Sequence, residues 1–195
     1  TDFAVEGVSF DLEPGEILGL VGESGAGKST IGNGIVQLLS PPGRVSKGEI
    51  YLNDSKISDF NEQQILKVRG SRVGFIFQDP MTSLNPVFNV GMQIMEPLRK
   101  HMGLDKSAAA KRAVELLELV GIPDAERRLK DYPHQFSGGM RQRVMIAMAM
   151  VCRPRLLIAD EPTTALDVSI QSQILSLMED LKQKMGMSLM LITHD

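Results

Sequence analysis

The chain has 195 residues, of which 43% are hydrophobic and 23% are charged, proportions that are ordinary for a soluble globular protein. Its formal net charge of −3 provides no basic surface, which argues against nucleic acid as the main partner. The single cysteine excludes an internal disulfide framework and a thiolate metal cluster. The longest uninterrupted apolar run covers residues 144–152, whereas a membrane-spanning helix needs about 20 residues, so we expect no span.

The first 21 residues predict two β segments. Apolar side chains alternate only roughly over residues 1–10, and Glu13-Pro14-Gly15-Glu16 supplies a turn before the apolar run 17–21. We therefore expect a hairpin beside the main sheet, followed by a buried parallel strand over 17–21.

Residues 22–29 match the pattern GxxxxGK[ST] at every fixed position. Glycines let the backbone wrap closely around an anion, and a helix expected from Lys28 adds the positive end of its dipole. Lys28 would neutralise the β- and γ-phosphates, and the Ser29 hydroxyl would ligate Mg²⁺. The predicted nucleotide-binding residues are Gly22, Glu23, Ser24, Gly25, Ala26, Gly27, Lys28, Ser29 and Thr30. Alone, the motif indicates only a nucleoside triphosphate, because kinases, GTPases and transport motors share it.

Further strands and helices alternate along the rest of the chain. Strands are expected over 48–52, 73–77, 156–159 and 188–193, and helices over 28–39 and 137–152. Gln78 follows the strand 73–77, and the region from about 80 to 135 is mostly helical, with Asp105 or Ser107 as one N-cap. This alternation predicts an α/β fold with a parallel sheet, an inserted helical lobe, and ligands at the carboxyl ends of the strands.

Two carboxylates follow the expected strand 156–159. Asp160 comes after four apolar residues and fits the acid that holds Mg²⁺ on a Walker B strand, whereas Glu161 would polarise the attacking water. The alternative is a pair of surface acids at a strand end.

Residues 136–142 contain a second candidate anion site. A Ser137-Gly138-Gly139 triplet at the start of a helix exposes backbone N–H groups and a hydroxyl. In the alternative reading Ser137 is only an N-cap and the glycines form a turn. Because one triphosphate fills only one phosphate site, the presence of two needs an explanation.

The order of these motifs resembles that of the ATP-binding cassette (ABC) family over essentially the whole chain. In sequence, the chain has the phosphate loop, Gln78, Ser137-Gly138-Gly139, Asp160-Glu161, Ala165-Leu166-Asp167 and His194. The resemblance implies an α/β P-loop NTPase fold with a mostly parallel core sheet, a small antiparallel β region at the N-terminus and an inserted helical subdomain. It implies one nucleotide-binding domain over 1–195, trimmed at both ends, with its core at 1–79 and 153–195 and the helical subdomain at about 80–152.

The same resemblance implies roles for individual residues, with ATP and Mg²⁺ as ligands. Two such domains meet head to tail in the family, so Ser137, Gly138 and Gly139 would bind the nucleotide held by a second subunit, with Asp167 at the dimer seam. The implied catalytic residues are Glu161, His194 and Gln78, and the implied Mg²⁺ ligands are Ser29, Gln78 and Asp160.

Residues 77–86 and 132–140 look like the branch of importers for oligopeptides, dipeptides and nickel, close to the ATP-binding subunits of dipeptide permeases. By this resemblance the chain is an ATP-hydrolysing subunit, peripheral on the cytoplasmic face of a prokaryotic membrane. Its partners would be a second nucleotide-binding domain, identical or not, transmembrane permease subunits and, indirectly, an extracytoplasmic solute-binding protein, with no nucleic acid. The alternatives are an importer ATPase for nickel or another small solute, a soluble ABC ATPase of DNA repair or translation, and a regulatory module that no longer hydrolyses ATP.

Overall fold

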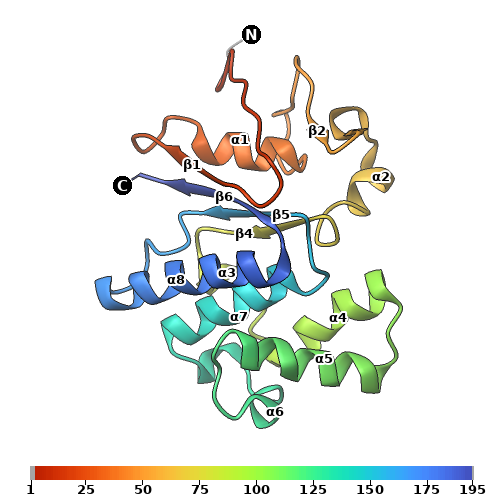
Figure 1. Cartoon of the computed structure of the whole chain (residues 1–195), viewed down its shortest axis with the longest axis vertical. Coiled ribbons are helices and arrows are strands. Elements are labelled where there is room, and N and C mark those ends of the chain that lie inside the picture. The colour runs from red at the N-terminus through yellow and green to blue at the C-terminus, as the bar shows by residue number, and fades with distance from the viewer. Residues whose placement is uncertain (1–2, 195) are drawn as a thin grey trace.

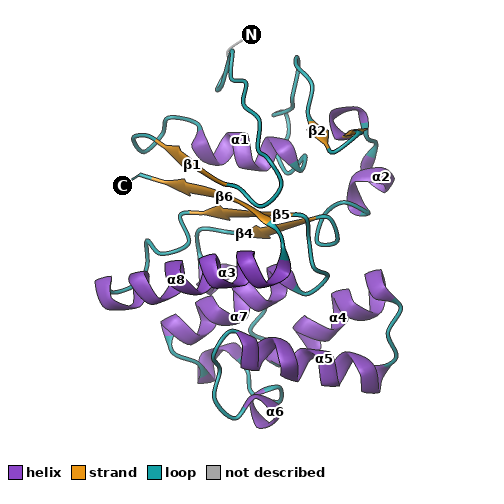
Figure 2. Ribbon diagram, viewed as in Figure 1, coloured by secondary structure: helices purple, strands orange, loops and turns teal. Residues whose placement is uncertain are grey.

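A four-stranded parallel sheet forms the centre of the molecule (Figures 1 and 2). The computed structural model describes residues 3–194. The strands lie in the order β1 (Ile17–Val21), β6 (Ser188–Thr193), β5 (Leu156–Asp160) and β4 (Val73–Ile76). All three pairings are parallel, as the alternation of strands and helices predicts. The carboxyl ends of the four strands therefore meet at one edge of the sheet.

The inner strands β5 and β6 are buried, whereas β1 lies at the edge of the sheet. β5 is buried at four of its five positions. In β1, by contrast, Ile17 is 43% and Val21 63% exposed, so the strand predicted over 17–21 forms but is only half-buried. The physical reason is that no described strand pairs with the outer side of β1.

Helix α1 (Lys28–Ile35) covers one face of the sheet (Figure 1). Gly32 allows its close approach, because a Cβ at this position would lie 2.9 Å from the Ile192 Cδ1 atom. The helix is shorter than the predicted span 28–39. Gln37 adopts a positive φ of 55°, and the Leu38 amide returns to the Asn33 carbonyl, which closes the helix early.

Helices α7 (Gly138–Met150) and α8 (Val168–Met185) lie on the opposite face (Figure 2). Gly74 of β4 is required for this packing, because a Cβ there would stand 2.2 Å from the Ala149 carbonyl oxygen. The buried side chains of α7, including Val144, Ile146 and Met150, join the sheet to the helical lobe in one continuous hydrophobic cluster.

The helical lobe lies between β4 and β5 in the chain. Its helices are α3 (Pro80–Ser83), α4 (Val90–Met102), α5 (Lys106–Leu119) and α6 (Ala125–Arg128), followed by the 3₁₀ helix η2 (Pro133–Gln135). Of the two predicted caps of α5, Asp105 is used, and its carboxylate accepts from the Ala108 amide at 2.8 Å. Because the hydrophobic cluster continues from the lobe into the sheet, the boundaries at 79 and 153 stay predictions.

The antiparallel β region is smaller than expected and lies elsewhere in the chain. It consists of β2 (Tyr51–Leu52) and β3 (Ser55–Lys56), followed by η1 (Ile57–Asp59) and α2 (Glu62–Leu66). Residues 3–16 form no strand, so the predicted hairpin is not formed there, and residues 1 and 2 lie outside the described part. Phe3, Val8 and Phe10 are 41–50% exposed, so this segment lacks the buried face that would stabilise a strand. Within residues 3–194, no helix combines the length and apolarity that a membrane crossing requires.

Candidate active site

The phosphate loop connects the carboxyl end of β1 to the first turn of α1. Gly25 and Gly27 have φ values of 82° and 91°, in the left-handed region that glycine adopts without strain. The Lys28 side chain is buried by the loop, and its ammonium donates to the carbonyl oxygens of Gly22 and Glu23, both at 2.7 Å. A positive charge therefore lies where the loop amides and the dipole of α1 also favour an anion.

Ser29 and Asp160 meet across the sheet edge. The Ser29 hydroxyl donates to Asp160 Oδ1 at 3.0 Å, and Asp160 is only 5% exposed. Burial raises the pKa of the Asp160 carboxyl, and the charge of Glu161 adds to this effect, whereas the Ser29 hydrogen bond and the Lys28 charge oppose it. A buried carboxylate beside a hydroxyl offers the hard oxygen ligands that Mg²⁺ prefers, so these two residues fit the metal.

Glu161 has an unusual backbone conformation directly after β5. Its φ is 44°, a left-handed conformation that costs a non-glycine residue about 1–3 kcal/mol, and its amide donates to the Ile192 carbonyl at 2.8 Å. The carboxylate oxygen Oε2 accepts from Gln78 Nε2 and from Thr164 Oγ1, both at 3.1 Å. His194 Nδ1 lies 3.5 Å from the same oxygen. The structure thus brings together Gln78, Glu161 and His194, which follow three neighbouring strands.

One cavity of about 600 Å³ lies at this edge of the sheet. Its wall consists of Ala4, Ser24, Gly25, Gly27, Lys28, Ser29, Thr30, Gln78, Glu161, Thr164 and His194. The phosphate loop and the carboxylate edge of the sheet therefore face the same space, which is large enough for a bound phosphate chain and a water molecule.

The triplet Ser137-Gly138-Gly139 does not belong to this cavity. Ser137 and Gly138 are exposed. Ser137 Oγ accepts from the Met140 amide at 3.3 Å, so Ser137 forms the N-cap that the alternative interpretation of this triplet predicts. Gly139 packs against the start of α8, where a Cβ would lie 3.1 Å from Ile170 Cγ2. Asp167 is an exposed N-cap of α8 whose side chain makes no capping hydrogen bond. The structure places the triplet next to α8 and away from the phosphate loop of its own chain.

Thr164 is a site residue that the sequence reasoning missed. Its hydroxyl contacts Glu161, and its side chain lines the cavity. The available signal was a hydroxyl residue three positions after Glu161, in the turn Pro162-Thr163-Thr164 that leads to α8. That spacing is common in turns, so it does not by itself identify a functional contact.

Comparison with known proteins identifies the family. The model of the family described as "ABC transporter" matches residues 5–164. The chain belongs to the ABC transporter family. Among solved structures, the dimeric ATP-binding cassette MJ0796 with ADP and Pi is 32% identical with a TM-score of 0.84, covering 98% of this chain and 80% of that one. For cbiO1 from Clostridium perfringens the values are 31%, 0.83, 98% and 72%. The predicted family and the predicted α/β P-loop fold are confirmed.

Curated ABC transporter relatives are more similar in sequence but longer. OppD, an oligopeptide transport ATP-binding protein of Bacillus subtilis (strain 168), is 57% identical over 193 residues, which are 98% of this chain and 54% of OppD. DppD, a dipeptide transport ATP-binding protein of Escherichia coli (strain K12), is 54% identical over 192 residues, covering 98% of this chain and 59% of DppD. The chain thus spans somewhat more than half the length of these relatives.

The substitution Asp160→Asn is expected to stabilise the subunit at neutral pH. The pKa of Asp160 is raised in the folded state, so the protonated carboxyl stabilises the folded subunit. This contribution is fully present below the pKa of the unfolded state and is lost as the pH rises through the pKa of the folded state. Asparagine cannot ionise, so the free energy of unfolding should rise by about 1 kcal/mol at pH 7 and by little at pH 4. Denaturant unfolding of the full-length subunit without nucleotide measures both values. Asp180→Asn, at an exposed position of α8, is the matched control, and an equal gain there would contradict the prediction.

Proposed function

We propose that this chain is the ATP-hydrolysing domain of an importer subunit in the ABC transporter family. The observation that carries the proposal is the meeting of Lys28, Glu161 and His194 around one cavity at the carboxyl edge of the sheet, with Asp160 joined to the cavity wall through Ser29. This is the place where α/β sheets bind their ligands. A regulatory module without hydrolysis is disfavoured, because a carboxylate base and its polar neighbours are all in position.

The residues have distinct roles in the proposed reaction. The loop residues 22–30, including Lys28, bind the triphosphate. Ser29, Asp160 and Gln78 would hold Mg²⁺, which neutralises charge on the phosphate oxygens when bound. Glu161 accepts a proton from the attacking water. Gln78 and His194 contact the Glu161 carboxylate and hold it in place. His194 is also close enough to the cavity to contact the γ-phosphate.

The second half of the site is proposed to come from another subunit. Ser137, Gly138 and Gly139 are away from the phosphate loop of their own chain, yet they form the start of a 13-residue helix, α7. MJ0796, which has a similar fold, is a dimer in two solved structures. The triplet, of which Ser137 and Gly138 are exposed, would cap the nucleotide held by the partner, and the nearby Asp167 would lie at the seam between the two subunits.

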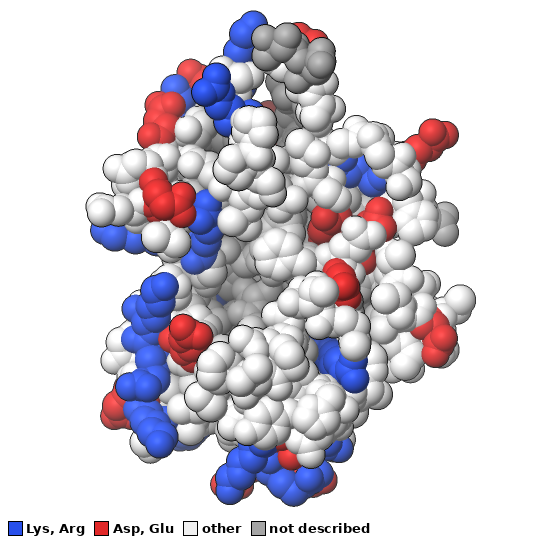
Figure 3. All heavy atoms as spheres, turned by 180° about the vertical axis from the view of Figure 1, so that it is seen from behind, with Lys and Arg blue, Asp and Glu red and all other residues white. Residues whose placement is uncertain are grey.

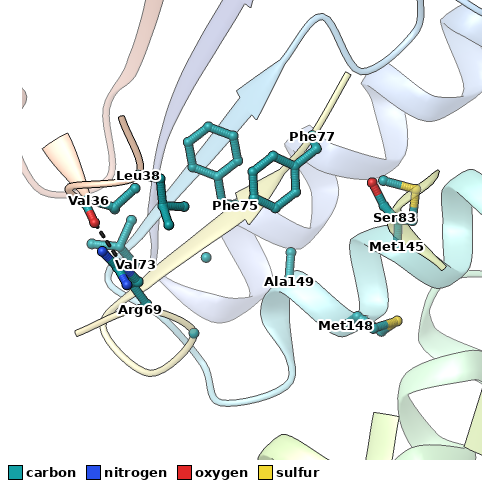
Figure 4. Close-up of a pocket in the computed structure, with 12 residues that line it drawn as sticks. Val36, Leu38, Arg69, Val73, Phe75, Phe77, Ser83, Met145, Met148 and Ala149 are labelled. Atoms are coloured by element: carbon teal, nitrogen blue, oxygen red, sulfur yellow. Dashed lines mark hydrogen bonds between the residues drawn. The ribbon is translucent and has the colours of Figure 1, made fainter. Parts of the chain in front are cut away.

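Permease subunits of the membrane are the proposed second partner. Residues 77–92, on both sides of Gln78, expose a group of large apolar side chains, Phe77, Met81, Val87, Phe88 and Met92, each 43–73% exposed. The pocket drawn in Figure 4, of about 250 Å³, lies beside them between β4, α7 and the end of α1, with the stacked rings of Phe75 and Phe77 in its wall. The face seen in Figure 3 is hollowed at its centre, where the surface is mostly uncharged, and Lys and Arg border the hollow on one side. Such a surface fits an apolar protein partner, and it would place the domain peripherally on the cytoplasmic face of the membrane.

Peptides are the proposed solute, because the relatives named in the preceding section are peptide transport proteins and are 54–57% identical over nearly the whole chain. Nickel or another small solute is the alternative, since the solute is selected by the permease and an extracytoplasmic binding protein. A role in DNA repair or translation is disfavoured, because Lys and Arg are interspersed with Asp and Glu in Figure 3 and the net charge is −3.

The experiment that tests this function uses the full-length subunit assembled with its permease subunits and solute-binding protein in lipid vesicles. We expect ATP hydrolysis that increases with di- or oligopeptides, accompanied by peptide accumulation inside the vesicles. Stimulation by nickel alone would replace the peptide assignment, whereas stimulation by DNA or ribosomes without vesicles would contradict the transport function. Absence of ATP hydrolysis by the intact complex would contradict the enzymatic function.

A further inference from the structure

Thr164 lies in a turn whose shape is imposed by α8. The Thr164 amide donates to the Glu161 carbonyl at 3.3 Å, and the Leu166 amide donates to the Thr163 carbonyl at 3.0 Å. From the first turns of α8, Gln171 Nε2 donates to the carbonyl oxygens of Thr163 and Leu166, both at 3.0 Å. The Thr164 hydroxyl is thus held at a defined place beside the Glu161 carboxylate, although the residue is on the surface.

The two oxygens of the Glu161 carboxylate have different surroundings. Oε2 has three polar neighbours, which are the Gln78 amide and the Thr164 hydroxyl, both at 3.1 Å, and His194 Nδ1 at 3.5 Å. In the described residues 3–194, no side chain or amide donates to Oε1. A carboxylate held through one oxygen presents the other, so Oε1 is the oxygen available to a water molecule in the cavity.

We infer, on the basis of the proposed function, that Thr164 is a positioning residue that anchors Glu161 by Oε2 so that Oε1 serves as the base. In the reaction the O–H bond of the attacking water breaks and its proton passes to Oε1. The water oxygen forms a bond to the γ-phosphorus, and the bond between that phosphorus and the bridging oxygen of the leaving diphosphate breaks. Thr164 exchanges no proton with the substrate and acts only through the orientation of Glu161.

Thr164 differs from the other two neighbours of Oε2, because these follow different strands from the one that carries Glu161. Gln78 follows β4 and precedes the exposed apolar segment, and His194 follows β6 with 52% of its side chain exposed. Neither is close to Glu161 along the chain. Thr164, by contrast, is only three residues from Glu161 and is tied to α8 through its turn, so it is the donor that stays with the carboxylate.

The test compares Thr164→Val, Thr164→Ala, Thr164→Ser and Thr163→Val in the full-length subunit within its intact transporter complex. Valine and alanine remove the hydroxyl, and we expect both to lower the single-turnover hydrolysis rate about tenfold with an unchanged KM for ATP, since a hydrogen bond to a charged group is lost. Serine should restore the rate. Thr163→Val is the matched control, because Thr163 joins the turn through its backbone oxygen, and it should behave as wild type.

The split between the hydrolysis rate and the KM for ATP distinguishes positioning from a general structural effect. Damage to the cavity would change ATP binding as well as the rate, whereas loss of the anchor on Glu161 lowers the rate alone, and Thr164→Ser restores it.

Three results would overturn the role of Thr164. They are a wild-type rate in Thr164→Val and Thr164→Ala, a Thr164→Ser rate as low as that of valine, or an equal loss in Thr163→Val. The proposed function is judged separately by wild type and Glu161→Gln. If wild type hydrolyses ATP and Glu161→Gln does not, a normal rate in Thr164→Val refutes the positioning role alone.

Discussion

Glu161→Gln in the full-length subunit is expected to bind ATP and to hydrolyse it about 10³-fold more slowly than wild type. Glutamine keeps the shape of the side chain but cannot accept a proton from water. The ATP that persists would hold two subunits together, so a dimer should accumulate with ATP and Mg²⁺. Phosphate release measures the rate, and light scattering of the variant with and without ATP measures the association.

Glu179→Gln is the matched control for this substitution, because it makes the same chemical change at an exposed position of α8. It should hydrolyse ATP at the wild-type rate. Near-normal turnover by Glu161→Gln would refute the assignment of Glu161 as the base, and failure of the variant to bind ATP would indicate that the substitution damaged the cavity.

Ser137→Arg is expected to block ATP hydrolysis while leaving ATP binding by the isolated subunit intact. Ser137 is exposed and does not line the cavity of its own chain, so a large cation there disturbs only a nucleotide that is bound by another subunit. Loss of the N-cap costs about 1 kcal/mol, which a folded domain tolerates. Binding of a fluorescent ATP analogue and ATPase turnover measure the two effects, with Ser176→Arg on α8 as the control.

The position of the complete site can be read from dimers assembled from two tagged copies of the full-length subunit. When Lys28→Met is on one copy and Ser137→Arg on the other, both defects fall in one composite site, and about half of the wild-type rate should remain. When both substitutions are on the same copy, each composite site carries one defect and activity should be lost. The opposite outcome would mean that Ser137 acts within its own chain.

Much of the fold is predictable because buried parallel strands read as continuous apolar runs. The runs that become β4, β5 and β6 are recognisable for this reason. The sequence limits the cap of α5 to Asp105 or Ser107, and the structure uses Asp105. The ends of elements are less predictable, because they depend on distant partners. The helix that begins at Lys28 stops at Ile35, because the backbone of Gln37 has a positive φ of 55°. The Gln37 side chain, through Nε2, donates to the distant carbonyl oxygens of Ile57 and Phe60.

Close packing explains two glycines, Gly32 and Gly74, whose role is not apparent from the sequence. Gly32 and Gly74 are in a helix and a strand, where glycine is otherwise unfavourable. In the folded molecule they make room for Ile192 and for the Ala149 carbonyl, respectively. Gly34 has no such close neighbour, because a Cβ there would meet only ordinary contacts, and nothing in the structure requires glycine at that position.

The phosphate loop, the pair Asp160-Glu161 and the order of the motifs are properties of the sequence by itself, because each depends on residue types at short spacing along the chain. Only the tertiary structure decided how these parts combine. The parallel order of the strands brings Gln78 and His194, which are far apart in the chain, to one carboxylate oxygen of Glu161. It also keeps Ser137 out of the cavity formed by the phosphate loop of its own chain. The contact of Thr164 with Glu161 also arises at this level, because a left-handed backbone at Glu161 and a turn tied to α8 direct two side chains toward each other.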